Sequence, residues 1–213
     1  MRLAWLVAGA MVVTSVLAGS GCSSSEPTPE RSAEKTGTAS QAIQGGSVDT
    51  SNQFKFAVGV CHGNPNQCFG VCSGALILPN VVATARHCVD RSPQIIDCSK
   101  NPSFEGRKNG SFNVTTNVQM FGGSGSAGWY SVKSIAVPDD DHICGNDIAL
   151  LVLNQSIPAN VTKPIIPGVQ YLMWDPEQYA PYFIGIGYGN TSPSNNDSGT
   201  RRVSKPISVL CVP

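Results

Sequence analysis

The chain has 213 residues, with 14 lysines and arginines against 14 aspartates and glutamates, so its formal net charge at pH 7 is zero. A balanced chain has no net positive field for binding nucleic acid or an anionic membrane, and we expect no nucleic-acid partner. Charged residues make up 13% of the chain, below the roughly 25% usual in soluble domains. With 22 glycines and 15 prolines, this composition favours β-strands joined by many turns.

The first 21 residues are typical of an export signal. Met1 and Arg2 precede an apolar run over residues 3–17, and small residues follow at 18–21. The run is too short and wrongly flanked for a membrane span, so we expect residues 1–21 to be a signal peptide. The protein is then secreted or exposed at the cell surface.

Cys22 leaves two alternatives open. It could accept a lipid that tethers the protein to a membrane, or ordinary cleavage could occur near Ser20 or Gly21. Gly19 stands where lipoprotein signals usually carry an aliphatic residue. Residues 22–42 indicate a disordered linker or propeptide, because positions 23–42 contain no aromatic or branched aliphatic side chain with which to form a core.

From Ile43 onward, short apolar runs alternate with Gly, Pro and Asn, which predicts an all-β domain in which any helices are short. Pro79 and Asn80 separate two of these runs and predict a hairpin. We expect strands at 54–60, 73–78, 81–84, 112–121, 129–137, 148–153, 182–187 and 203–212.

The cysteines are expected to form disulfides, because an exported chain meets an oxidising compartment. If Cys22 is removed or lipidated, seven cysteines remain, which is an odd number, and Cys211 is left without a partner. The sequence leaves the connectivity open, and the pairs to consider are Cys72 with Cys88, Cys61 with Cys68, and Cys98 with Cys144.

We expect no metal ion and no cofactor. Cys61, Cys68 and Cys72, with His62 nearby, are alternative zinc ligands, but their spacing fits no common zinc pattern and we interpret His62 as a loop residue. The acidic stretch Asp139, Asp140, Asp141 and His142 is interpreted as a solvated surface turn, with calcium binding as the alternative.

The stretch CSGALILPNVVATARHCV, residues 72–89, places His87 in a short turn after the expected hairpin. A bridge from Cys72 to Cys88 would close a loop worth about 3 kcal/mol and would hold the backbone of His87 in place. A general base needs such placement, because its imidazole must lie within hydrogen-bond reach of a proton. This segment resembles the histidine motif of the trypsin-like (chymotrypsin-fold) serine proteases.

Three other segments resemble motifs of the same family, in the same order. Residues 43–46, IQGG, resemble the mature N-terminus, where cleavage of a precursor exposes the amine of Ile43. Residues 146–151, NDIALL, resemble the aspartate motif, and residues 185–189, GIGYG, resemble the glycine-aromatic-glycine strand early in the second barrel. The resemblance covers residues 43–213, and it implies two antiparallel Greek-key barrels with the active site between them.

By this resemblance the first barrel is complete, over residue 43 to about residue 155, and the second is incomplete. The resemblance also assigns Asp147 as the carboxylate that accepts the proton-bearing nitrogen of His87, fixes its tautomer and stabilises the imidazolium. The alternative for Asp147 is a solvated strand cap. Ala42 precedes Ile43 where many relatives carry Arg or Lys, so an activating cleavage would need an enzyme that accepts a small residue.

Ser198, within the triplet Asp197-Ser198-Gly199, is the serine to weigh as a nucleophile. In the family the nucleophile follows the aspartate by about 90 residues, whereas Ser198 follows Asp147 by 51. Asn196 and Thr200 also stand where the family's Gly-Asp-Ser-Gly-Gly turn has glycines. We therefore interpret Ser198 as a loop residue.

The resemblance implies an exported serine endopeptidase that acts on protein or peptide substrates through a Ser-His-Asp triad. This chain is expected to be truncated before the nucleophile and, as written, to be inactive, because a base and its orienting acid cannot run acyl transfer alone. The alternative is a non-catalytic homologue that serves as a protein-binding module. The sequence indicates no oligomeric state.

Overall fold

The computed structural model describes residues 43, 45–123, 125–168, 175 and 177–209. The expected signal peptide, Cys22, the linker and Cys211 lie outside the described residues. Within these ranges, the structure contains no helix with the length and apolar character needed to cross a membrane.

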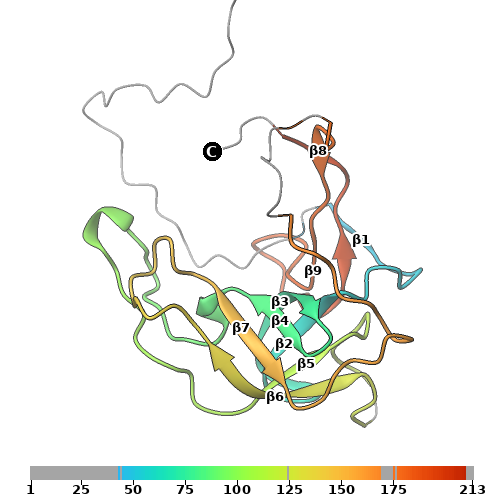
Figure 1. Cartoon of the computed structure of the whole chain (residues 1–213), viewed down its shortest axis with the longest axis horizontal. Coiled ribbons are helices and arrows are strands. Elements are labelled where there is room, and N and C mark those ends of the chain that lie inside the picture. The colour runs from blue at the N-terminus through green and yellow to red at the C-terminus, as the bar shows by residue number, and fades with distance from the viewer. Residues whose placement is uncertain (1–42, 44, 124, 169–174, 176, 210–213) are drawn as a thin grey trace, which may run out of the picture.

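Six antiparallel strands close into a barrel in the order β2-β3-β4-β7-β6-β5 (Figure 1). Their bounds are β2 Ala57–Asn64, β3 Gln67–Leu78, β4 Val81–Thr84, β5 Phe112–Thr115, β6 Trp129–Ala136 and β7 Ala149–Leu153. Because β7 inserts between β4 and β6, strands far apart in sequence become neighbours. The all-β class and the first barrel expected from the sequence are confirmed.

The core of the barrel follows from the alternation of side chains along each strand. In β7 the inward positions Ala149, Leu151 and Leu153 are buried, and in β2 Val58 and Val60 are buried. Each fully buried Val or Leu contributes about 1.5–3 kcal/mol.

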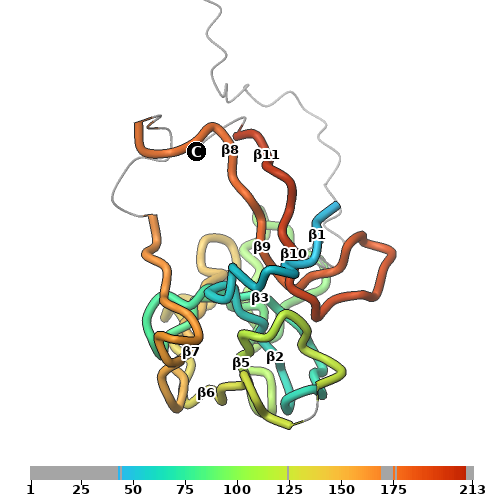
Figure 2. The backbone as a smooth tube through the Cα atoms, turned by 90° about the vertical axis from the view of Figure 1, so that its right-hand side faces the viewer, coloured from blue at the N-terminus to red at the C-terminus, as the bar shows by residue number. Residues whose placement is uncertain are grey.

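The remaining described strands form two small sheets. One has the order β1-β10-β9, from Ser47–Val48, Arg202–Val203 and Ile186–Gly187, and the other pairs β8, Tyr182–Phe183, with β11, Ile207–Ser208. Figure 2 shows β1, β9 and β10 beside the barrel, whereas β8 and β11 extend away from it.

A buried polar cluster joins these segments to the barrel. Arg201 is fully buried and donates to Asp49 Oδ2 at 2.9 Å, to the carbonyl of Thr116 at 3.0 Å and to the hydroxyl of Tyr188 at 3.0 Å. Burial raises the pKa of Tyr188 to about 12, more than the nearby Arg201 lowers it, so the phenol is neutral. This cluster was not predicted from the sequence.

The expected and observed strand boundaries agree best where the sequence pattern lies within a few consecutive residues. The prediction of 81–84 matches β4, and the hairpin at Pro79 and Asn80 is confirmed. Two three-residue 3-10 turns, η1 Arg86–Cys88 and η2 Cys98–Lys100, are the helices of the described part of the chain, which confirms that helices are short.

Five strand predictions were wrong in extent, and one of them, 73–78, is the second half of the longer strand β3, Gln67–Leu78. The run 112–121 ends as a strand at Thr115, and beyond it the backbone amide of Met120 donates to the carbonyl of Gly199 at 2.8 Å, in the loop before β10. The run 54–60 begins as a strand only at Ala57, since the amide of Phe54 is held by Asp49 in a turn. The runs 182–187 and 203–212 each divide into two short strands within the described residues.

Candidate active site

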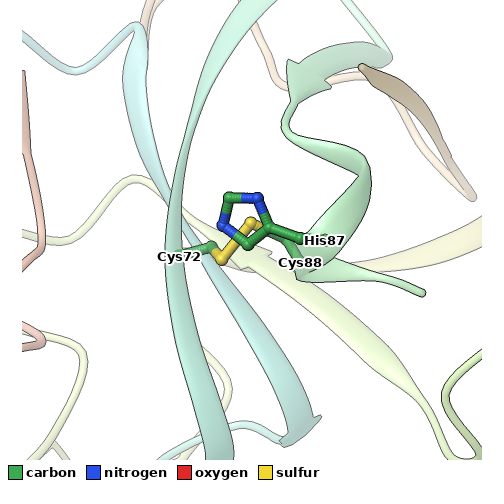
Figure 3. Close-up of side chains that lie close together, drawn as sticks. All are labelled: Cys72, His87 and Cys88. Carbon is green, nitrogen blue, oxygen red and sulfur yellow. A yellow bond between two sulfur atoms is a disulfide. The ribbon is translucent and has the colours of Figure 1, made fainter. Parts of the chain in front are cut away.

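His87 lies in η1, directly after β4, and a disulfide anchors this turn. Cys88 is bonded to Cys72 of β3, and Figure 3 shows the imidazole beside that bridge. A ring nitrogen of His87 lies within 4.8 Å of both sulfur atoms. The sulfur atoms are bonded to each other, so this group offers no thiolate to a metal ion.

Asp147 holds His87 through two hydrogen bonds. Its Oδ2 lies 2.8 Å from Nδ1 of the imidazole, and its Oδ1 accepts the backbone N–H of His87, also at 2.8 Å. Both side chains are about one-third exposed, at 33% and 36%. With Nδ1–H donated to the carboxylate, Nε2 is the nitrogen that can take a proton from a substrate or nucleophile.

The barrel topology explains why these two residues meet. Strand β4 pairs with β7, with Thr84 opposite Ala149. His87 follows Thr84 by three residues and Asp147 precedes Ala149 by two, so antiparallel pairing places both at the same end of the sheet. The two motifs are 60 residues apart in the chain and adjacent in the fold.

Arg86, next to His87, makes buried polar contacts that were not predicted from the sequence. It is 3% exposed, donates from Nε to Asp90 at 2.8 Å and from Nη1 to the carbonyl of Asp140 at 2.7 Å, and pairs through Nη2 with Asp141. Burial lowers the pKa of its guanidinium, but the two carboxylates outweigh that effect and the pKa lies above its usual value. A permanent buried cation therefore links η1 to the loop before Asp147.

The acidic stretch at 139–141, which contacts Arg86, was noticed in the sequence. Asp139, Asp140 and Asp141 are exposed, as the interpretation of a solvated turn requires, and Asp140 accepts from the amide of His142 at 3.0 Å. The interpretation overlooked that a carboxylate of this turn could reach a buried arginine.

The three disulfides considered from the sequence are present. Besides Cys72–Cys88, the structure contains Cys61–Cys68, across the β2–β3 hairpin, and Cys98–Cys144, which ties η2 to the loop that precedes Asp147. Every cysteine of the zinc alternative is thus half of a disulfide. His62 lies in β2, so its interpretation as a loop residue was wrong: its ring stacks on Phe112 with centroids 4.9 Å apart.

A hollow of about 350 Å³ opens beside His87. Its lining residues include His62, Cys72, Cys88, Lys108, Asn190 and Ser198. Lys108 Nζ donates to the carbonyl of His87 at 2.8 Å. The hollow gives a ligand direct access to the candidate base.

Ser198 lies between β9 and β10 on the wall of this hollow, and no hydrogen bond between it and His87 is present within the described residues. Its neighbour Asp197 accepts from the amide and hydroxyl of Thr191, both at 2.8 Å. The hydrogen bond from the backbone N–H of Thr191 is the largest cause of the lowered pKa of Asp197. Asp197 therefore organises its own loop.

Ile43 precedes β1 and lies close to β9. Its backbone N–H donates to the carbonyl of Asn190 at 2.8 Å. The side chain of Ile43 approaches Gly187 of β9, where a Cβ would lie 3.6 Å from its Cδ1.

Comparison with family models gives a match to Trypsin over residues 43–207. The solved structure of GrC matches with a TM-score of 0.54 and 17% identity, covering 75% of this chain and 62% of that chain. The scabies mite inactivated protease paralogue S-D1 matches with a TM-score of 0.52 and 19% identity, covering 76% of this chain and 60% of that chain. The chain therefore spans about three fifths of the length of these two structures. Comparison with curated proteins gave no match.

Proposed function

The chain belongs to the trypsin family, and from this we propose that it carries the general base and its orienting acid of an exported serine endopeptidase acting on proteins or peptides. The observation that carries the proposal is the double hydrogen bond from His87 to Asp147, at 2.8 Å each. In the reaction, Nε2 of His87 takes the proton of a serine hydroxyl as its oxygen attacks the peptide carbonyl. The imidazolium then returns that proton to the leaving amine.

We assign the nucleophile to sequence that follows residue 213, with Ser198 as a loop residue. Two observations support Ser198 as a loop residue. Its neighbour Asp197 accepts hydrogen bonds from Thr191, and Ser198 has no hydrogen bond to His87 among the described residues. Exposed apolar side chains on and beside β8 and β11 support further strands that would cover them; these are Tyr182, Phe183, Ile184, Ile207 and Val209. The specificity pocket would belong to the same following sequence.

Export and the signal peptide at 1–21 are parts of the same proposal, with a lipid on Cys22 and ordinary cleavage near Ser20 or Gly21 as its two alternatives. The three disulfides support an oxidising compartment. Activation would cleave the Ala42–Ile43 bond and make Ile43 the new N-terminus. N-terminal sequencing and intact mass of the protein recovered from its native host test both cleavage sites and the lipid.

The second candidate is a non-catalytic homologue that binds a protein or peptide in the hollow beside His87. One of the similar solved structures is an inactivated protease paralogue, which favours keeping this candidate. A binding module requires no nucleophile, whereas a serine endopeptidase requires one.

The discriminating experiment uses a fluorophosphonate probe, which labels an activated serine. We expect no labelling of the 213-residue chain, and labelling of a product extended by the codons after Pro213, lost on His87→Ala. Labelling of the 213-residue chain that Ser198→Ala abolishes would overturn the assignment of the nucleophile. An extended product that folds and binds peptides but is not labelled would favour the binding module.

A further inference from the structure

Two hollows beside the candidate active site share Lys108 in their lining. The first, of about 350 Å³, contains His87, and the second, of about 210 Å³, is lined by Arg107, Lys133 and neighbouring residues of β5 and β6. Lys108 lines both. The two are also joined by a stacked ring pair, because His62 lines the first and Phe112 lines the second.

The charges along this lining have one sign. We define the cationic path as Arg107, Lys108 and Lys133. Of the described residues that line the two hollows, none is an aspartate or glutamate. Arg107 donates to Asp90 at 2.6 Å, but neither Lys108 nor Lys133 has an ion pair within 4.0 Å among the described residues. Lys108 and Lys133 therefore line these hollows without an ion-pair partner of their own in the described part of the chain, although the charge of Asp90 acts on Lys108.

Lys108 is held in place for this role. It is half-buried, and its ammonium donates to the carbonyls of His87 at 2.8 Å and Cys88 at 3.5 Å. An ammonium has three N–H groups, so one stays free for a ligand. Burial is the largest influence on Lys108 and lowers its pKa, against the opposing charge of Asp90. A bound carboxylate would offset that desolvation.

We propose that the cationic path binds an acidic segment of the polypeptide whose peptide bond lies at His87. This inference rests on the proposed function, which supplies the polypeptide. The second hollow suits glutamate, because Phe112, Val132 and Ile135 contact the methylenes while Lys133 and Arg107 meet the carboxylate. The chain has zero net charge, so it lacks the positive field that binds a nucleic-acid backbone. The apolar residues that line the second hollow also favour an acidic peptide.

The test measures binding, which needs no nucleophile. Fluorescence anisotropy with the full chain compares a fluorescein-labelled peptide that carries three consecutive glutamates with the same peptide carrying glutamines. We expect the glutamate peptide to bind about tenfold more tightly at about 50 mM salt, with most of the difference lost at about 300 mM. Lys108→Gln should weaken binding of the glutamate peptide by about fivefold and Lys133→Gln by about twofold.

Lys163→Gln is the matched control, since Lys163 is exposed and lines neither hollow. Lys133 is also exposed, so its variant keeps the test valid if Lys108→Gln does not fold. Equal affinity for the two peptides, an equal loss in the Lys163 variant, no binding of either peptide, or tighter binding of a single-stranded oligonucleotide of the same charge would each overturn the inference. Failure of the proposed function appears separately, as an extended product that the fluorophosphonate does not label.

Discussion

Arg86 and Asp141 form an ion pair that joins the turn carrying His87 to the loop that leads to Asp147. The guanidinium is buried, whereas the side chain of Asp141 is 69% exposed and reaches it from the surface. The same guanidinium holds the buried carboxylate of Asp90. The approach of base and acid is therefore supported by contacts outside the pair itself.

Arg86→Met should destabilise the fold by about 3–5 kcal/mol, because it leaves Asp90 buried with Arg107 as its remaining partner. Urea unfolding followed by tryptophan fluorescence measures this. The backbone amide of His87 should also exchange with solvent faster, as its acceptor Asp147 becomes less well placed. Lys163→Met, at an exposed site, should change stability by less than about 0.5 kcal/mol. Equal stabilities of the two variants would contradict the role of Arg86.

Removing the Cys72–Cys88 disulfide should mobilise His87 specifically. The chain-entropy estimate gives a loss of about 3 kcal/mol for its 16-residue separation and about 2.4 kcal/mol for the seven-residue separation of Cys61–Cys68. These losses are close, so the Cys61→Ala/Cys68→Ala variant is a control of similar stability. Amide exchange at His87 should quicken only when Cys72 and Cys88 are replaced. The same exchange rate in both variants would mean that the bridge does not position the base.

Asp147→Ala should change which nitrogen of His87 carries the proton. In the wild type Nδ1–H donates to Asp147, whereas a free neutral imidazole has no carboxylate to favour that tautomer. Nitrogen-15 NMR of the imidazoles distinguishes the two tautomers. In an extended, active product the Asp147→Ala substitution should lower kcat by about 10⁴-fold.

The chain provides its own control for this measurement. Asp140 lies 2.6 Å from Nδ1 of His142 in an exposed pair. Asp140→Ala should alter the signals of His142 and leave those of His87 unchanged. A change at His87 in this variant would show that the spectrum reports a general disturbance of the loop.

The sequence predicted features whose signal is local. Val81–Thr84 is an apolar run that ends at a recognisable histidine motif, and Pro79 and Asn80 mark the hairpin before it. The pairing of Cys72 with Cys88 was among those considered because both flank that motif. Each of these depends on residues close together in the chain.

The sequence could not predict contacts between distant polar residues. Arg201 stands in the polar stretch SGTRRV, which is typical of a surface loop, yet it is fully buried and bonded to Asp49, 152 residues away. Its burial depends on acceptors from three separate segments, and no pattern near Arg201 encodes them. His62 was misplaced for a related reason, since the ring of Phe112 that stacks on it belongs to another strand.

Asp49 and Arg201 should make the fold sensitive to acid. Burial raises the pKa of Asp49, but the amides of Phe54 and Gln53 and the guanidinium of Arg201 outweigh it, so the folded-state pKa lies below 3.8. The unfolded chain then binds the proton more tightly, and the stability that this carboxylate contributes is present above about pH 4 and is lost as the pH falls through the folded-state pKa. Asp49→Asn should lower stability by about 3–5 kcal/mol at pH 7, because it leaves Arg201 buried without its anion. Urea unfolding at steps from pH 7 to pH 2.5 should show this deficit narrowing below about pH 4, where the wild type loses the same charge. A deficit that stays constant to the lowest pH would mean that Asp49 is not ionised in the folded protein.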